Sequence, residues 1–135
     1  MRIVLDTNVL VSALLRDASV PAQVVDLWFA GDVDLVVDSR IVAEYREVLR
    51  RPEFSFDAHD VDALLAMVDR AERVVAAPLP VTLPDPSDAP FLEVAAAAAV
   101  DALVTGKVRH FRIREGRIDI PVLTPRAFLN LLGGR

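Results

Sequence analysis

The chain alternates short apolar runs with longer segments of helical periodicity, and this alternation restricts the fold more than any other feature. The apolar runs at residues 2–5, 35–37, 102–105 and 120–123 are too short for helices and predict strands. Strands separated by helices require crossover connections, which produce a parallel sheet covered on both faces. We therefore expect a three-layer α/β/α fold with a central parallel sheet of four to five strands.

Helical segments fill the intervals between these runs, and capping residues and prolines mark their ends. Asn8 is available to cap the first helix, Ser39 is expected to cap the third, and Pro52 stops it. The proline-rich stretch 77–86 predicts an extended connection rather than a domain linker, so we expect a single domain spanning 1–135. The other predicted helices span residues 8–16, 20–30, 60–73, 85–99 and 125–132.

Composition excludes several classes of protein. Hydrophobic residues make up 53% of the chain, which suffices for a buried core, and the absence of cysteine excludes disulfide scaffolds and thiolate metal sites. No apolar run reaches the roughly 18 residues of a membrane span, so a cytoplasmic location is expected. The net charge of -5 argues against a broad basic surface, although bound cations or a local basic strip would still permit nucleic-acid binding.

Acidic residues are placed where a parallel sheet binds ligands, beyond the carboxyl ends of its strands. Asp6 directly follows the first strand, and Thr105 ends a later one. On two predicted helices, Glu44 and Asp88 border the apolar face rather than the polar one. Three carboxylates directed toward one edge would raise one another's pKa values, and a hard divalent cation such as Mg²⁺ or Mn²⁺ would relieve that repulsion.

Each of these acids also has a simpler interpretation. Asp6 could cap the following helix, Asp88 could be the third position of a capping box, and Glu44 could bend toward solvent. Asp101 is excluded as a ligand because it begins its strand, on the order of 13 Å from the edge where the strand ends. Asp38 ends its strand at the correct edge and remains a candidate outer ligand.

A series of motifs along nearly the whole chain resembles a known family. The motifs are Asp6-Thr7-Asn8, Ser39 with Glu44, Asp85-Pro86-Ser87-Asp88, Asp101 to Gly106, and Ile120 to Pro125 followed by Phe128-Leu129. In this order and spacing they are similar to the PIN domain, a Rossmann-like fold. Within that family they resemble the short bacterial toxins related to VapC.

The resemblance implies an endoribonuclease that hydrolyses RNA phosphodiester bonds with Mg²⁺ or Mn²⁺. Asp6, Glu44 and Asp88 match acids that are catalytic and bind the metal. Asn8 and Thr105 match polar positions that orient ligands or contact phosphate. The implied partners are single-stranded or structured RNA, a cognate antitoxin protein, and a second copy of the chain in a homodimer.

The sequence departs from the family pattern at the fourth acid. Where relatives often carry aspartate or asparagine after the Thr-Gly pair, this chain has Lys107, its only lysine. One hypothesis is that the Lys107 ammonium takes part of the role of a second metal ion and contacts phosphate. The alternative is that Lys107 extends into solvent and leaves a catalytically weakened scaffold that binds RNA or protein.

The stretch after Thr105 is the most basic in the chain, and it includes Lys107, Arg109, Arg112, Arg114 and Arg117. It could steer RNA toward the acids, or it could be a solvated hairpin or an antitoxin-facing surface. Within it, Arg109 and His110 are candidates for substrate binding. His110 could instead ligate metal or pack against Phe111.

Two further alternatives stay open at this stage. Leu27, Trp28 and Phe29, together with an apolar first helix, could form a dimer or antitoxin contact, or they could simply pack in the core. Asp6 could also act as an aspartyl nucleophile of a phosphotransferase. Asn8 disfavours that interpretation, because haloacid-dehalogenase-like enzymes, which use such a nucleophile, carry a second aspartate at this position.

Overall fold

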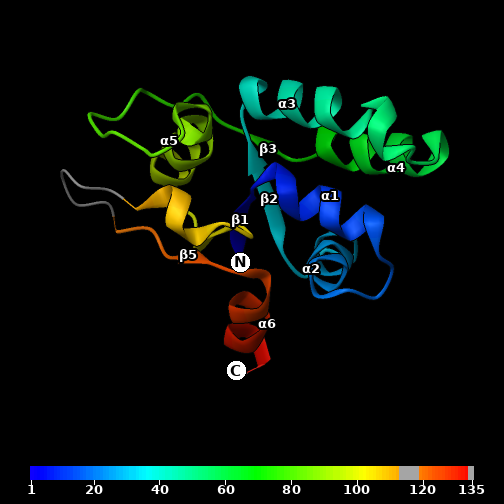
Figure 1. Cartoon of the computed structure of the whole chain (residues 1–135). Helices are drawn as coiled ribbons and strands as arrows, with labels where there is room; N and C mark the ends of the chain where they lie inside the picture. Colours follow the sequence, from blue (N-terminus) through cyan, green and yellow to red (C-terminus); the bar gives the residue numbers. More distant parts are fainter. Residues whose placement is uncertain (113–118, 134–135) are drawn as a thin grey trace.

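The computed structural model describes residues 1–112 and 119–133, and its centre is a five-stranded parallel sheet (Figure 1). The strands are β1 (Arg2–Leu5), β2 (Asp34–Val37), β3 (Glu72–Arg73), β4 (Ala102–Val104) and β5 (Val122–Leu123). They lie in the order β3-β2-β1-β4-β5, and each neighbouring pair is parallel. The predicted parallel sheet is thus confirmed.

Helices connect the strands and cover both faces of the sheet. The α-helices are α1 (Thr7–Leu15), α2 (Val20–Phe29), α3 (Ser39–Leu49), α4 (Ala58–Asp69), α5 (Ala89–Ala98) and α6 (Pro125–Gly133). Three short 3-10 helices are η1 (Pro52–Phe54), η2 (Pro86–Asp88) and η3 (Val108–Phe111). Helix α5 lies against β1, β2 and β4, whereas α1, α2 and α6 lie on the other side (Figure 1). This arrangement confirms the three-layer α/β/α prediction.

The central strands are apolar along their length because both faces of the sheet are covered. Val4 and Leu5 of β1 and Leu103 of β4 have no exposed surface. Strands buried on both faces appear in a sequence as continuous apolar runs, which is why β1 and β4 are predictable. Ala95 of α5 is equally buried, and its small side chain allows the helix to lie close to the sheet.

One predicted helix boundary is wrong. The helix expected over residues 60–73 is α4 (Ala58–Asp69), and Glu72 and Arg73 instead form the edge strand β3, paired with Val36 and Val37 of β2. Both side chains of this two-residue strand are exposed. It therefore carries no apolar pattern that would distinguish it from the end of a helix.

The predicted cap of α3 is also wrong, because Asp38 occupies that position instead of Ser39. The Asp38 carboxylate accepts a hydrogen bond from the Ile41 amide at 2.9 Å and another from Nε of Arg40 at 2.8 Å. Arg40 in turn donates to Glu93 of α5 at 2.7 Å. Asp38 is thus engaged within the fold, which argues against the outer-ligand role considered for it.

Glu93 is a buried acid that links three segments, so its removal should destabilise the fold. Its two oxygens accept from Arg40 and from the Leu79 amide at 3.2 Å. We expect Glu93→Ala to lower the free energy of unfolding by about 2 kcal/mol, because the Leu79 amide and Nη1 of Arg40 lose their acceptor in a part-buried place, although Arg40 keeps Asp38. Urea denaturation measures this, with Glu47→Ala, which removes an exposed pair with Arg51, as a control of little effect. Equal stability of the Glu93→Ala variant and the wild type would contradict the expectation.

The apolar helices contribute mainly to the core. Trp28 is only 5% exposed, as the core-packing alternative expects, whereas Phe29 is 42% exposed and Leu15 is 59% exposed. Among the residues described, no helix combines the length and the apolar character needed to cross a membrane.

Candidate active site

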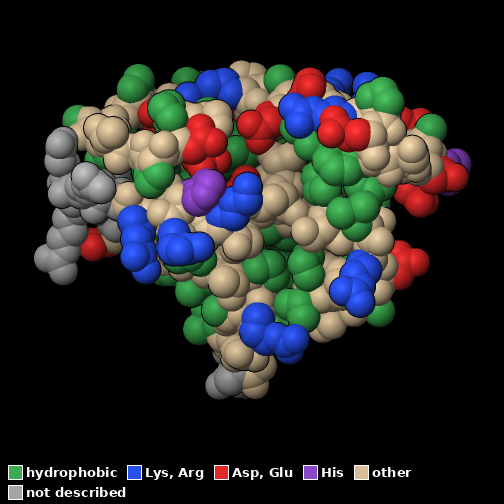
Figure 2. All heavy atoms as spheres, in the orientation of Figure 1, with side chains coloured by type: hydrophobic (Ala, Val, Ile, Leu, Met, Phe, Trp, Pro, Cys, Tyr) green, Lys and Arg blue, Asp and Glu red, His purple; other side chains and the backbone are tan. Residues whose placement is uncertain are grey.

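An acidic cleft of about 330 Å³ lies at the carboxyl edge of the sheet. Acidic side chains gather there beside a histidine and cationic side chains (Figure 2). Larger hollows of about 490 and 500 Å³ lie around Phe29. We identify the acidic cleft as the candidate site by the residues that line it, because the other hollows are larger. Its lining residues are Asp6, Thr7, Asn8, Val11, Glu44, Val48, Arg51, Phe54, Asp85, Ser87, Asp88, Lys107 and His110.

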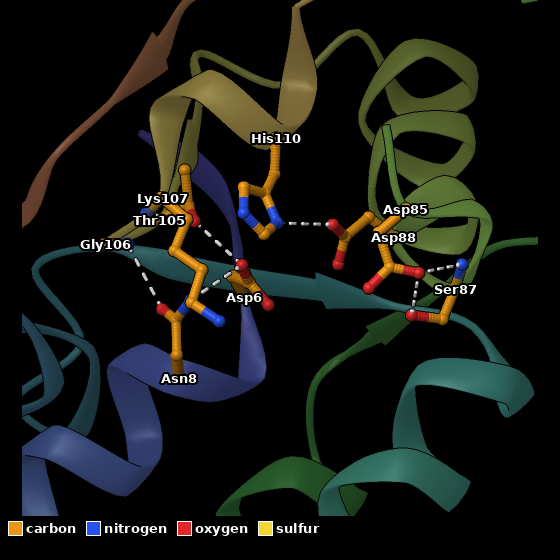
Figure 3. A network of polar contacts seen from close by, with 9 residues as sticks. All are labelled: Asp6, Asn8, Asp85, Ser87, Asp88, Thr105, Gly106, Lys107 and His110. Atoms are coloured by element: carbon orange, nitrogen blue, oxygen red, sulfur yellow. Dashed lines mark hydrogen bonds and ion pairs between the residues drawn. The ribbon is translucent and has the colours of Figure 1, made fainter. Parts of the chain in front are cut away.

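Asp6 stands at the end of β1 and is 6% exposed. Leu5 lies opposite Val104 in the sheet, so Thr105 follows at the neighbouring position. The Thr105 hydroxyl donates to Oδ2 of Asp6 at 2.7 Å, and Nδ2 of Asn8 donates to the same oxygen at 3.1 Å (Figure 3). Asp6 occupies the N-cap position of α1, where Asn8 was expected, but its side chain makes no capping hydrogen bond.

Glu44 reaches the cleft from α3, and the neighbouring Tyr45 fixes that helix in place. The buried Tyr45 hydroxyl donates to the Leu5 carbonyl at 2.5 Å, which holds α3 against the end of β1. The Thr7 hydroxyl donates to Oε2 of Glu44. Glu44 is therefore half-buried in the cleft and does not bend away to solvent. No pattern in the sequence predicts this role for Thr7.

Asp88 enters the cleft from η2 and faces His110, whose Nδ1 lies 3.4 Å from Oδ2 of Asp88 (Figure 3). This Oδ2 atom is buried and has no hydrogen-bond partner among the residues that the structure describes. Asp85 accepts from the amide and hydroxyl of Ser87 at 3.0 and 2.8 Å. Potential ligand atoms of Asp85, Asp88 and His110 all lie within 4.8 Å of one another. Asp85, which the sequence suggests only as a cap, thus joins the acids of the cleft.

Lys107 enters the cleft beside Asp6, from the segment after β4. The Lys107 amide donates to Oγ1 of Thr105 at 3.0 Å, and the Gly106 amide donates to Oδ1 of Asn8 at 3.1 Å. These bonds hold the segment against the start of α1, and the Lys107 side chain extends toward Asp6 and Asn8 (Figure 3). Its positive charge lowers the pKa of Asp6 and so opposes the effect of burial.

Burial raises the pKa of Asp6, Glu44 and Asp88 from the ordinary values of these groups. The charge of Asp6 raises the pKa of Glu44 and Asp88 further, while His110 lowers that of Asp88. By contrast, hydrogen bonds from Ser87 lower the pKa of Asp85. The buried Asp6 therefore opposes the ionisation of the half-buried Glu44 and Asp88, and a bound cation would allow all three to be charged together.

The fold brings most of the predicted site residues to this cleft. Those that line it are Asp6, Asn8, Glu44, Asp88, Lys107 and His110. Thr105 is fully buried below the cleft, where it contacts Asp6. Arg109 is exposed on η3 and is not among the lining residues. Arg112 is also exposed, whereas Arg114 and Arg117 lie outside the described residues.

A parallel α/β fold with carboxylates at its strand ends places the chain among α/β proteins whose site lies at the carboxyl edge of the sheet. A family model described as the PIN domain matches residues 2–109, which includes β1 to β4 and most of the cleft. The chain therefore belongs to the PIN domain family, whose members are generally nucleases that use divalent metal ions. Among curated protein sequences, none matches the chain at a significant level.

Proposed function

We propose that this protein is an endoribonuclease that hydrolyses RNA phosphodiester bonds with Mg²⁺ or Mn²⁺. The observation that carries the proposal is that Asp6, Glu44 and Asp88 line one cleft and that burial raises the pKa of each. The buried Oδ2 atom of Asp88, which has no hydrogen-bond partner among the described residues, fits a cation site. Such an all-oxygen set of acids suits Mg²⁺ and Mn²⁺ better than softer metals.

In this proposal Asp6, Glu44 and Asp88 would hold the ion. Asp85 and His110, which lie close to Asp88, are additional candidate ligands on that side of the cleft. When bound, the ion polarises a phosphoryl oxygen and lowers the pKa of a water molecule. Thr105 and Asn8 orient Asp6 through their hydrogen bonds to Oδ2. Glu44 or Asp88 would accept a proton from the attacking water as the water oxygen bonds to phosphorus and the bond from phosphorus to the ribose oxygen breaks, and the departing oxygen would take a proton from solvent.

Lys107 has a separate role in the proposal. Its side chain extends toward Asp6, so the ammonium provides a positive charge where a second metal ion would otherwise act. We propose that one divalent ion suffices and that Lys107 donates a hydrogen bond to a phosphate oxygen. Arg109 and His110 are proposed to contact the RNA on the same side, where exposed positive charge attracts the phosphate backbone.

The biological role we propose is that of a toxin in a toxin–antitoxin pair. Its support is the ordered series of motifs similar to the VapC toxins. The same comparison supports a single PIN domain over 1–135, a homodimer, a cognate antitoxin and a cytoplasmic location. Induced expression of the wild type, but not of a cleavage-deficient variant, should then arrest growth of the host cell.

An RNA cleavage assay with controlled metal content tests the proposed activity. Purified protein should cleave a labelled RNA in the presence of Mg²⁺ or Mn²⁺, lose activity in EDTA, and recover it when the ion is restored. Cleavage that persists unchanged in excess EDTA would contradict the metal-dependent mechanism.

A second candidate function is a catalytically weakened PIN scaffold that binds RNA or protein. The observation that favours it is the position of Lys107 beside Asp6, which places a cation among the acids. RNA binding without cleavage under any metal condition would favour this scaffold over the nuclease.

A further inference from the structure

The acidic cleft has an aromatic wall that neither the catalytic acids nor Lys107 accounts for. Phe54, at the end of η1, lines the cleft together with Glu44 and Asp6. Of the described residues that line it, Phe54 alone has a phenyl or indole side chain. The residue is half-buried, so part of its surface stays accessible.

The Phe54 ring is held in place by stacking against the Phe56 ring. The two rings stack with centroids 5.2 Å apart and planes 10° from parallel. Between them, Ser55 adopts a left-handed conformation with φ of 50°, and both its amide and its hydroxyl donate to the Pro52 carbonyl at 3.1 Å. Phe56 lines a different hollow with Leu49 and other residues. Phe54 is therefore a supported ring at the cleft wall rather than a loose side chain.

The cation beside this ring is paired with a glutamate on the surface. Arg51, which also lines the cleft, donates from Nε and Nη2 to the two carboxylate oxygens of Glu47 at 3.0 and 2.7 Å. Val11 and Val48 add apolar surface to the same cleft. This part of the cleft thus presents apolar and aromatic surface, whereas phosphate-binding charge enters with Lys107.

We propose that Phe54 stacks on an unpaired nucleobase of the RNA and so provides a base-binding position beside the acids. A base in a duplex is already stacked on both faces and cannot lie against a ring in a cleft, whereas an unpaired base can. The identity of the polymer as RNA rests on the proposed function. The stacking itself does not depend on catalysis.

Binding measurements with a fluorescein-labelled oligoribonucleotide test the proposal. Single-stranded and duplex forms of one sequence are compared by fluorescence anisotropy, in EDTA to prevent cleavage and again with Mg²⁺ in the Asp6→Asn background. Phe54→Leu keeps the apolar bulk but removes the aromatic face, and it should weaken single-strand binding about 10-fold or more while leaving duplex binding unchanged. Phe54→Trp should restore or tighten single-strand binding.

Phe29→Leu is the matched control, because Phe29 also keeps part of its ring accessible but lines hollows that do not include Asp6, Glu44 or Asp88. It should leave both affinities at the wild-type level. Wild-type single-strand affinity in Phe54→Leu, or equal losses for single strand and duplex, would overturn the stacking proposal. If Phe54→Leu weakens single-strand binding but the wild type does not cleave RNA, the nuclease proposal fails and the base-binding site stands. If the wild type cleaves RNA but Phe54→Leu leaves binding unchanged, the stacking proposal fails and the nuclease stands.

Discussion

Replacing Asp6 with asparagine should reduce metal-dependent RNA cleavage by roughly 100-fold or more, because a carboxylate that holds the ion is lost. The fold should survive, since an asparagine oxygen can still accept the hydrogen bonds that Thr105 and Asn8 now donate to Asp6. Cleavage rates at saturating Mg²⁺ and Mn²⁺ measure the effect, and circular dichroism checks the fold.

Although Asp6→Asn should lose activity, it should not lose thermal stability in the absence of divalent ions. Burial raises the pKa of Asp6, so its charge is unfavourable in the folded protein when no ion is bound. Without divalent ions, Asp6→Asn should therefore melt at the same temperature as the wild type or higher, and only the wild type should gain stability from Mn²⁺. Asp101→Asn is the matched control, because Asp101 lies at the other edge of the sheet, where it accepts from the Arg2 amide. Wild-type cleavage by Asp6→Asn would contradict the assignment.

Removing the charge of Lys107 should have the second large effect on activity. We expect Lys107→Met to lower kcat/KM by about 10-fold to 100-fold, because a charge-assisted hydrogen bond to phosphate is lost. The salt dependence of RNA binding should weaken by about one phosphate contact, a readout that a purely structural role would not change. Arg126→Met, at an exposed position on α6, removes the same kind of charge far from the cleft and should have little effect.

Lys107→Asp separates the two interpretations of this residue. If the ammonium participates, the variant should lose activity even when additional Mn²⁺ binds to the new carboxylate. Higher cleavage in Lys107→Asp than in the wild type would instead mean that Lys107 blocks a second metal site. Calorimetric titration with Mn²⁺ gives the number of ions bound in each case.

The sequence allowed the sheet edge to be predicted because that edge is defined by buried strands. Continuous apolar runs mark β1 and β4, and parallel strands end at the same edge, so Asp6 and Thr105 could be expected to be neighbours. Strand β3 could not be found this way, because its two residues, Glu72 and Arg73, are both exposed. Its existence depends on pairing with β2, which is a property of the assembled sheet.

The acids contributed by helices were predictable only in part. Glu44 and Asp88 border apolar faces, which is visible in the helical period, but Asp85 has a local capping role that hides its proximity to His110. Glu93 lies in an alanine-rich helix and finds Arg40 from a distant segment. Contacts of this kind depend on how α3 and α5 pack, and no local pattern reports them.

The central claim is that the carboxylates of Asp6, Glu44 and Asp88, which come from separate segments, share one divalent cation. Anomalous diffraction from a crystal soaked in Mn²⁺ tests it most directly. We predict one anomalous peak in the acidic cleft, contacted by oxygens of Asp6, Glu44 and Asp88. We expect no second peak beside Asp6, because the Lys107 ammonium occupies that position. A soaked crystal with no manganese between these carboxylates, or with manganese only at sites elsewhere on the surface, would contradict the account.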